Sequence, residues 1–330
     1  MTKKAIGFLG MGCYIPEKVL TNFDLEKMVD TNNEWIVERT GISARHIAAP
    51  EQATSDMAVL AAEKALLDAG VSAEELDLII LATESPDTKF PSTACLVQER
   101  LGAKHAAAFD LSAGCSGFVY GVAVASQMIA GGLYKKVLVI GAETLSRIMN
   151  WQDRNTCILF GDGAGAAVIG EVAAGYGILG IDLGADGAGG PYLVQPAGGS
   201  RKPATHETVD AREHFIHMSG NEVFKFAIKI MGKTALRTLE NAGLTKDDID
   251  LLVPHQANIR IINSAAKRLH LPMEKVMVNV DKYGNTSAAS IPIALCEAKE
   301  QGRLKQGENV LLVGFGAGLT WASIVMKWDQ

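Results

Sequence analysis

Long apolar runs are missing from this chain of 330 residues. No stretch reaches about 18 uninterrupted apolar residues, so no segment is expected to span a membrane. The N-terminus carries two lysines but only a short apolar run, which predicts a first strand at residues 5–9 and no signal peptide. The formal net charge of −6 gives no bulk attraction to nucleic acid, so an acidic partner would need a local basic patch.

Cysteine is scarce, and its spacing excludes further classes of protein. The cysteines are odd in number, widely scattered and without a CxxC pair: Cys13, Cys95, Cys115, Cys157 and Cys296. This pattern predicts reduced thiols in a cytoplasmic protein, without a disulfide framework or a zinc site. His214 and His217 have no third ligand nearby in the sequence, so no metal site is expected there.

The length and the order of segments predict an α/β protein. At 330 residues the chain exceeds the size at which one hydrophobic core usually stops growing, so we expect two subdomains. Apolar runs predict strands at 5–9, 76–82, 106–111, 137–141, 166–169, 251–253, 276–280, 310–313 and 323–326. Helical periodicity predicts helices at 55–69, 92–101, 115–130, 221–242, 259–269 and 288–301. This alternation is typical of sheets covered by helices.

The sequence contains an internal repeat. Residues 69–80 match residues 242–253, and residues 137–141 match residues 310–314, in both cases 173 positions further on. One offset kept over such a distance predicts two copies of one α/β half, residues 1–172 and 173–330. Because duplicated enzymes commonly place their site between the halves, a reactive group of one half should find its partners in the other.

Cys115 is the candidate nucleophile of the first half. An apolar run precedes it and a helical pattern follows it, so it should lie on a strand-to-helix turn. Unpaired backbone N–H groups and the helix dipole favour a thiolate at such a place. We expect Gly114 and Gly117 to leave room for a substrate beside the sulfur. The alternative is that Cys115 is a small core residue.

Two polar residues of the second half are candidate partners. His255 follows the predicted strand at 251–253, where open α/β sheets place functional groups. Asn285 follows the predicted strand at 276–280 and lies near the counterpart of the Cys115 turn by the 173-residue offset. The alternatives are a histidine bonded to backbone groups and an asparagine that caps a turn.

Three glycine-rich segments need separate interpretations. Residues 161–166 precede a predicted strand, and residues 10–12 lack a third glycine, so both are predicted to be tight turns and not nucleotide loops. Residues 314–318 follow a buried strand. Their freely turning backbone could place an N–H group near Cys115 to stabilise an oxyanion.

Taken together, residues 113–118, 253–258 and 284–289 resemble the beta-ketoacyl-acyl-carrier-protein synthase III family of the thiolase superfamily. Residues 34–42 and 161–166 carry the same resemblance. It implies the thiolase fold, a five-layered αβαβα arrangement of two pseudo-symmetric halves. Elongating synthases of the superfamily have a histidine at the position of Asn285, so the resemblance implies the initiating type.

The resemblance also implies a reaction, a decarboxylative condensation that starts fatty-acid chains. Cys115 would accept an acyl group from acetyl-CoA or another short acyl-CoA. His255 and Asn285 would bind the malonyl-acyl-carrier-protein thioester and stabilise its enolate as carbon dioxide leaves. Backbone N–H groups of Cys115 and Ala317 would form the oxyanion hole, although many members carry glycine where this chain has Ala317. No metal or redox cofactor is required.

Binding residues follow from the same resemblance. It implies CoA contacts by Trp35, Arg39, Arg154 and Asn258. It implies carrier-protein contacts by Lys225, Gln256, Ala257, Asn258, Ile259, Arg260, Lys267 and Arg268, several of which are basic. Phe90 matches a residue that reaches into the acyl pocket of the neighbouring subunit, which implies a homodimer.

Two other activities fit part of the pattern. A related condensing enzyme, such as a hydroxymethylglutaryl-CoA synthase or a polyketide-type synthase, would use a CoA-bound extender. A thioester hydrolase would use Cys115 and His255 and need no malonyl partner. A non-catalytic binding module would leave the convergence of three polar groups from separate loops unexplained.

Overall fold

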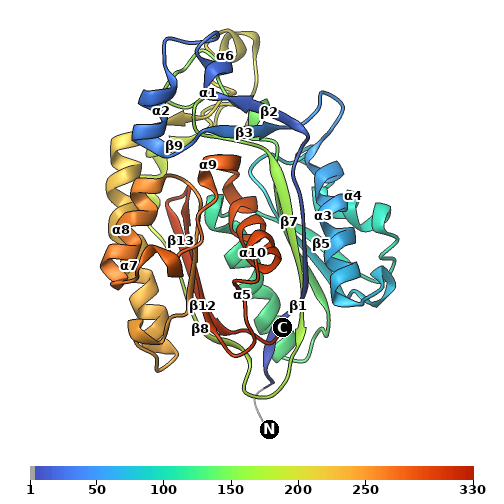
Figure 1. The fold of residues 1–330 in the computed structure, drawn as a ribbon. Helices are drawn as coiled ribbons and strands as arrows, with labels where there is room; N and C mark the ends of the chain where they lie inside the picture. The colour runs from blue at the N-terminus through green and yellow to red at the C-terminus, as the bar shows by residue number, and fades with distance from the viewer. Residues whose placement is uncertain (1–3) are drawn as a thin grey trace.

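The computed structural model describes residues 4–330, in which two sheets alternate with three layers of helices (Figure 1). The first sheet contains β1 (Ile6–Tyr14), β4 (Leu78–Ala82), β5 (Ala107–Leu111), β6 (Val137–Glu143) and β7 (Gly163–Glu171). The second contains β8 (Gly177–Ala185), β11 (Leu251–Pro254), β12 (Asn309–Gly316) and β13 (Thr320–Lys327). The order of layers is therefore αβαβα.

Each helix layer covers a face of a sheet. Two helices lie between the sheets, α5 (Gly117–Ala130) and α10 (Ser290–Glu300). The outer face of the first sheet is covered by α3 (Thr54–Ala69) and α4 (Thr93–Leu101), and that of the second by α7 (Gly220–Asn241) and α8 (Ile259–Leu269). Because central strands such as β4 are apolar and buried on both faces, they need helices on both sides.

The two sheets repeat one topology. Their strand orders are β1-β7-β6-β4-β5 and β8-β13-β12-β11. In the first sheet β6 pairs with β4 in parallel and with β7 antiparallel. In the second sheet β12 likewise pairs with β11 in parallel and with β13 antiparallel. The short turns before the central helices, η2 (Gly114–Ser116) and η7 (Ser287–Ala289), start 173 residues apart, as α5 and α10 do. The repeat found in the sequence is therefore a repeat of structure, and Ala288 is the counterpart of Cys115.

The predicted strand at 276–280 is wrong. Val276 forms only a single parallel bridge with Leu252, and the helix α9 (Val280–Tyr283) begins where the strand should end. The side chain of Gln256 binds this segment instead, since its Nε2 donates to the Met277 carbonyl (3.1 Å) and its Oε1 accepts from the Asn279 N–H (3.0 Å). The side-chain amide of Gln256 thus replaces some of the backbone hydrogen bonds that a strand at this place would form with its neighbour.

The predicted turn at residues 10–12 is also wrong, because these residues lie inside β1. Their glycines have a packing role. A Cβ atom at Gly10 would lie 2.3 Å from the Ala69 nitrogen, and one at Gly12 would lie 2.4 Å from the Ala65 nitrogen. Both glycines let α3 pack directly on the strand. The other predicted turn, at 161–166, is wrong for residues 163–166, which belong to the strand β7 that begins at Gly163.

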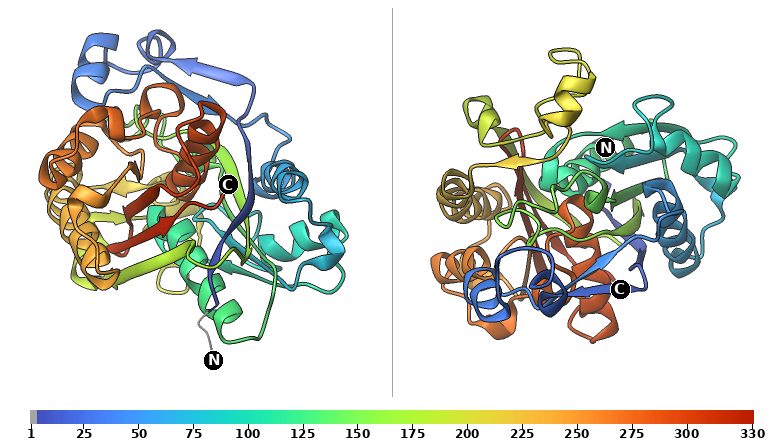
Figure 2. Two further views of the ribbon diagram at one scale, coloured as in Figure 1. Left: turned by 60° about the horizontal axis from the view of Figure 1, so that its bottom comes forward. Right: turned by 90° about the horizontal axis from the view of Figure 1, so that it is seen from above.

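Two insertions extend beyond the layers at one end of the sheets (Figures 1 and 2). The first contains β2 (Lys18–Thr21), α1 (Asn22–Leu25), α2 (Asn33–Thr40) and β3 (Ala44–Ile47). The second contains η4 (Gly187–Tyr192), β9 (Leu193–Val194), α6 (His206–Asp210) and β10 (His217–Met218). Most of these short elements were not predicted, since they lack a long apolar period. They place side chains around the cavities described next.

Candidate active site

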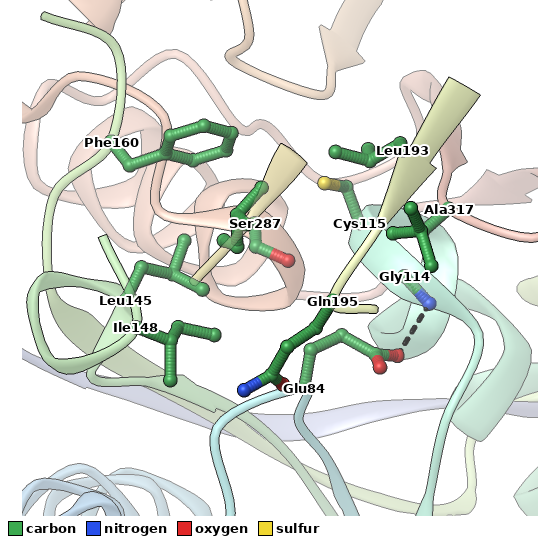
Figure 3. A pocket seen from close by; sticks show the side chains of 12 residues that line it. Glu84, Gly114, Cys115, Leu145, Ile148, Phe160, Leu193, Gln195, Ser287 and Ala317 are labelled. Atoms are coloured by element: carbon green, nitrogen blue, oxygen red, sulfur yellow. Dashed lines mark hydrogen bonds between the residues drawn. The ribbon is translucent and has the colours of Figure 1, made fainter. Parts of the chain in front are cut away.

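Two cavities meet at Cys115. The first, called here the His255 cavity, is also lined by His255, Asn285 and Phe315. The second, the Glu84 cavity, is lined by Glu84, Gln195, Ser287 and several apolar side chains, and is shown in Figure 3. The fold therefore brings the three predicted catalytic side chains, one from the first half and two from the second, to the wall of one cavity.

Cys115 lies where the sequence predicts, between β5 and α5 and on the turn η2. Its side chain is buried, with an exposed fraction of 8%. The neighbouring glycines have a packing role between loops and strands, and Gly114 also lines the Glu84 cavity beside Cys115. A Cβ atom at Gly114, whose φ is +56°, would lie 2.3 Å from the Ala317 nitrogen, and one at Gly117 would lie 2.9 Å from the Ala82 Cβ.

The expectation of a resting thiolate is wrong. Burial raises the pKa of the Cys115 thiol, Ser287 lowers it, and the nearby carboxyl groups of Glu143 and Glu84 raise it, with a net pKa of about 12. No cation balances these two carboxyl groups among the ion pairs of residues 4–330. Desolvation of the sulfur and the two nearby carboxyl groups raise the pKa of the thiol by more than the start of the helix lowers it. Cys115 therefore rests as a thiol.

His255 is held rigidly at the end of β11. Its backbone N–H donates to the Val313 carbonyl (2.8 Å), its Nδ1 lies 2.6 Å from the Ser290 hydroxyl, and its ring contacts Phe315 edge-on. Its Nε2 is buried and has no hydrogen-bond partner in the described chain. Burial lowers the pKa of His255 to about 3, so the imidazole is neutral. A neutral ring with one free nitrogen facing a cavity is suited to bind a polar ligand atom.

Asn285 lies opposite on the loop before α10. Its backbone pairs with the segment 159–161, since its N–H donates to the Leu159 carbonyl (2.8 Å) and its carbonyl accepts from Gly161 N–H (3.0 Å). Its side-chain Oδ1 accepts from the Ser287 N–H at 2.8 Å. The oxygen of the amide is thereby occupied, which leaves the NH₂ group as the end that can donate to a ligand.

The loop after β12 packs against the Cys115 turn. A Cβ atom at Gly316 would lie 2.2 Å from the Cys115 nitrogen, and Ala317 lines the Glu84 cavity beside Gly114. The two predicted oxyanion donors, the backbone N–H groups of Cys115 and Ala317, therefore come from adjacent loops.

The predicted CoA-binding residues gather at one place. The guanidinium carbons of Arg39 and Arg154 lie 4.7 and 4.6 Å from the centre of the Trp35 ring. Asn258 caps α8 and donates from its Nδ2 to the Arg39 carbonyl (2.9 Å). Asn258 also lines the His255 cavity, so this cluster lies next to the cavity's rim.

The residues predicted to contact a carrier protein differ in exposure. Arg260, Lys267 and Arg268 are exposed on α8, and Lys225 is exposed on α7, where it pairs with Glu222. Ile259 is half-buried and Ala257 lines the His255 cavity. Gln256 is 1% exposed and its side chain is bonded to the backbone of the 276–279 segment, as described above, so that side chain is not displayed on the surface.

Phe90 lines neither of these cavities and projects into solvent, with 87% of its surface exposed. The segment that carries it is tied to β5, the outermost strand of the first sheet, because the Thr93 N–H donates to the Asp110 carboxylate (2.7 Å). A large apolar side chain left in water beside an unpaired strand edge is typical of a contact surface.

Sequence reasoning missed three residues near the sulfur. Glu84 accepts from the Gly114 N–H (2.7 Å), and Glu143 accepts from Ser85 Oγ (2.6 Å). Ser287 lines the Glu84 cavity. Single acids at strand ends carry no local pattern. Ser287 does carry one signal, since it occupies the position that corresponds to Gly114 in the repeat.

Metal ligation and membrane insertion find no support in residues 4–330. No group of three or more histidine, cysteine, aspartate or glutamate side chains is arranged to hold a metal ion in this part of the chain. Within the same residues, none of the helices has the length and apolar character needed to cross a bilayer.

Comparison with known proteins agrees with this arrangement. The family described as "3-Oxoacyl-[acyl-carrier-protein (ACP)] synthase III" matches residues 109–187, and its "C terminal" part matches residues 239–328. A beta-ketoacyl-[acyl-carrier-protein] synthase III of Caldanaerobacter subterraneus is 63% identical over 328 residues, which is 99% of either chain. One from Desulfitobacterium hafniense is 61% identical over 326 residues, 99% of this chain and 98% of that one.

Solved structures give the same answer. The crystal structure of the 3-oxoacyl-[acyl-carrier-protein] synthase III from Aquifex aeolicus matches with a TM-score of 0.91 and 48% sequence identity. The match covers 98% of this chain and 100% of that chain. The fold is the thiolase fold, as the resemblance implied. By sequence and by structure, the chain belongs to the 3-oxoacyl-[acyl-carrier-protein] synthase III family.

Proposed function

We propose that the chain joins a short acyl-CoA, acetyl-CoA in the simplest case, to malonyl-acyl-carrier protein. The products are a 3-oxoacyl-acyl-carrier protein, CoA and carbon dioxide, and the reaction starts fatty-acid synthesis. The observation that carries this proposal is the His255 cavity, where Cys115, His255 and Asn285 from the two halves line one wall. Its family membership supports the same reaction.

The first step transfers the acyl group to Cys115. The sulfur attacks the thioester carbonyl of acyl-CoA, and the backbone N–H groups of Cys115 and Ala317 stabilise the oxyanion that forms. The free CoA leaves through the His255 cavity. The acyl group, now bonded to Cys115, stays in the Glu84 cavity, where Leu145, Ile148 and Leu193 provide apolar contacts.

The second step makes the carbon–carbon bond. The malonyl thioester oxygen accepts hydrogen bonds from the unpaired Nε2 of His255 and the free NH₂ group of Asn285. For Nε2 to donate, Nδ1 must accept, and the Ser290 hydroxyl at 2.6 Å can supply that proton. As carbon dioxide leaves, these two neutral donors stabilise the enolate, which attacks the acyl carbonyl on Cys115.

Binding of the two substrates uses different surfaces. Trp35 with Arg39 and Arg154 provides an aromatic face and two positive charges for the adenine and phosphates of CoA, next to Asn258 at the cavity rim. The exposed basic side chains on α7 and α8 offer a surface for an acidic carrier protein, namely Lys225, Arg260, Lys267 and Arg268.

The molecule acts as a cytoplasmic homodimer in this proposal. Phe90 is exposed beside the free edge of β5, so a second copy would cover both and receive Phe90 in its acyl cavity. Residues 1–172 and 173–330 form the two halves of each protomer. Cys115 belongs to the first half and His255 and Asn285 to the second, and no metal or redox group takes part.

The reaction can be tested in its two halves. Purified protein with acetyl-CoA should form acetyl-Cys115, seen by intact mass, and added malonyl-carrier protein should then release carbon dioxide. Cys115→Ser should lose acylation, while the matched control Cys95→Ser, at an exposed cysteine, should keep it. Asn285→Ala should still be acylated but should condense far more slowly. A Cys115→Ser protein with full condensing activity would refute the proposal.

The same assay separates the alternatives. A condensing enzyme with a CoA-bound extender would work as well with malonyl-CoA or acetoacetyl-CoA in place of malonyl-carrier protein. A thioester hydrolase would release free acid from acyl-CoA without any malonyl partner. We expect neither result.

A further inference from the structure

The Glu84 cavity carries one charged side chain in a mostly apolar wall. Leu145, Ile148 and Phe160 are among the apolar residues, whereas Glu84 presents its carboxyl group from the loop that follows β4. Figure 3 shows this carboxyl group beside the Gly114 N–H, at a different part of the wall from the Cys115 sulfur. An acyl group bonded to that sulfur therefore shares the cavity with a carboxyl group.

Few protein groups donate hydrogen bonds to the Glu84 carboxyl group. Its Oε1 accepts from the Gly114 N–H (2.7 Å) and the Ser112 hydroxyl (2.9 Å), and its Oε2 accepts from the same hydroxyl (3.0 Å). Gln195, on the same cavity wall, donates from its Nε2 to the His214 carbonyl instead (2.6 Å). No ion pair in the described part of the chain includes Glu84. Because a carboxylate has about four acceptor sites and two hydrogens serve both oxygens here, water must supply the rest.

The cavity is small enough for a short acyl chain to fill it. Its volume is about 100 Å³. A protein cavity of about 150 Å³ holds one benzene molecule, so by proportion this one has room for roughly four carbon atoms. An acetyl group leaves much of that space to water, whereas a four-carbon butyryl group takes it all. A second copy that places its Phe90 here, as proposed above, would reduce the space further.

A longer acyl chain would displace the water on which Glu84 depends. Burial already raises the pKa of this carboxyl group, which is a sign that it is short of water before any chain enters. Each methylene group taken out of water favours binding about fourfold, so the two that distinguish butyryl from acetyl favour it roughly fifteenfold. A buried charged group left without hydrogen-bond partners costs on the order of a hundredfold. The penalty is larger than the gain, so acetyl is favoured roughly tenfold over butyryl.

We propose that Glu84 determines primer length, by selecting acyl groups of two or three carbons over longer ones. This role rests on the acyl transfer to Cys115 proposed above. Glu84 forms no bond to the substrate and moves no proton. It acts through the water that an acetyl group leaves on its oxygens and that a longer chain removes. The selection therefore takes place at the acylation step, when the chain enters the Glu84 cavity.

Glu84→Gln tests the charge with little change in shape. Its side-chain oxygen can still accept from the Gly114 N–H, and its NH₂ group can donate to the Ser112 hydroxyl. Acylation rates with acetyl-CoA and butyryl-CoA, followed by intact mass, give the preference. The wild type should prefer acetyl roughly tenfold, and Glu84→Gln should lower this preference by about tenfold while the acetyl rate changes little. Glu99→Gln, at an exposed carboxyl group on α4, is the matched control and should keep the wild-type preference.

Glu84→Leu gives a second measurement, because it removes the polar group altogether and should prefer butyryl to acetyl. The ratio of the two rates is the readout, since a shift of the Cys115 turn would slow both substrates alike. Equal rates with both substrates in the wild type, or a wild-type ratio in both Glu84 variants, would overturn the selection. Equal slowing of both substrates in Glu84→Gln would also overturn it, because Glu84 would then only support the turn through Gly114. A wild-type protein acylated by neither substrate would instead overturn the proposed function.

Discussion

Replacing Glu143 by glutamine should stabilise the folded protein at alkaline pH and have little effect at acid pH. Burial and the neighbouring Glu84 raise the pKa of Glu143 from 4.5 to about 7 in the folded chain, while the unfolded chain keeps the ordinary value. Between these two pH values the folded state holds a proton that the unfolded state has lost. Stability therefore falls as the pH rises from 4.5 to about 7 and then stays low.

The size of this loss of stability follows from the difference between the pKa values of Glu143 in the folded and the unfolded chain. A carboxyl group moved from 4.5 to about 7 costs about 3 kcal/mol of folding free energy once it is ionised. Glutamine keeps an oxygen that can accept from Ser85 but carries no charge, so it should recover most of that amount. The side chain of Glu143 is fully buried, so solvent does not screen the cost.

Urea unfolding of both proteins at about pH 5 and about pH 8 measures the effect. The variant should be more stable than the wild type by about 2–3 kcal/mol at the higher pH and by under about 1 kcal/mol at the lower pH. His255, whose pKa burial lowers to about 3, costs stability as the pH falls below 6.5, but it does so in both proteins and cancels. Glu63→Gln, on the exposed face of α3, is the control and should change neither value. An equal difference between variant and wild type at both pH values would refute the reasoning.

Three further predictions concern the site and its supports. Ser290→Ala removes the hydroxyl that lies 2.6 Å from His255 Nδ1, so condensation should slow roughly tenfold while acylation changes little. Equal slowing of both steps would argue against the idea that Ser290 acts only by positioning the His255 imidazole. Trp35→Ala should raise the KM for acyl-CoA roughly tenfold with kcat little changed in steady-state kinetics, because the ring positions the two guanidinium groups that we propose as CoA contacts. Gly141→Ala should lower stability in urea by about 1–3 kcal/mol, since its Cβ would lie 2.2 Å from the Ala288 carbonyl oxygen. Its counterpart Gly314→Ala, whose nearest contact would be 3.3 Å, should cost less, and equal midpoints would contradict the packing argument.

The repeat and the layers could be predicted because their signals are local. Buried strands such as β4 and β11 are continuous apolar runs, and the matching stretches at 69–80 and 242–253 include a helix end, an acidic turn and a strand. The position of Cys115 between strand and helix followed from the same local pattern. The edge segment at 276–278 could not be predicted as irregular, because the side chain that binds it, Gln256, is distant in sequence.

The chemistry around the sulfur was harder to predict, because it depends on what surrounds it in space. The start of a helix is visible in the sequence and favours a thiolate. Burial and the carboxyl groups of Glu84 and Glu143 are not visible there, and they raise the pKa of Cys115 to about 12. Similarly, motif matching treated Gln256 as a surface residue, since a motif gives identity and not exposure. The three side chains that line the His255 cavity were found because the repeat directed attention to the second half.

The unequal edges of the two sheets limit how copies of the chain can add to one another. The first sheet ends in β5, a regular strand with an unpaired side, whereas at the same place the second sheet has only the single Val276 bridge. A molecule with two regular edges of this kind could recruit copies at both ends and grow into an open fibre. At this end of the two repeated sheets, β5 is the one regular edge strand among residues 4–330, so two molecules that pair through β5 leave no equivalent edge at this end for a third. The missing strand in the second copy of the repeat thus removes one of the edges at which further molecules could add by strand pairing.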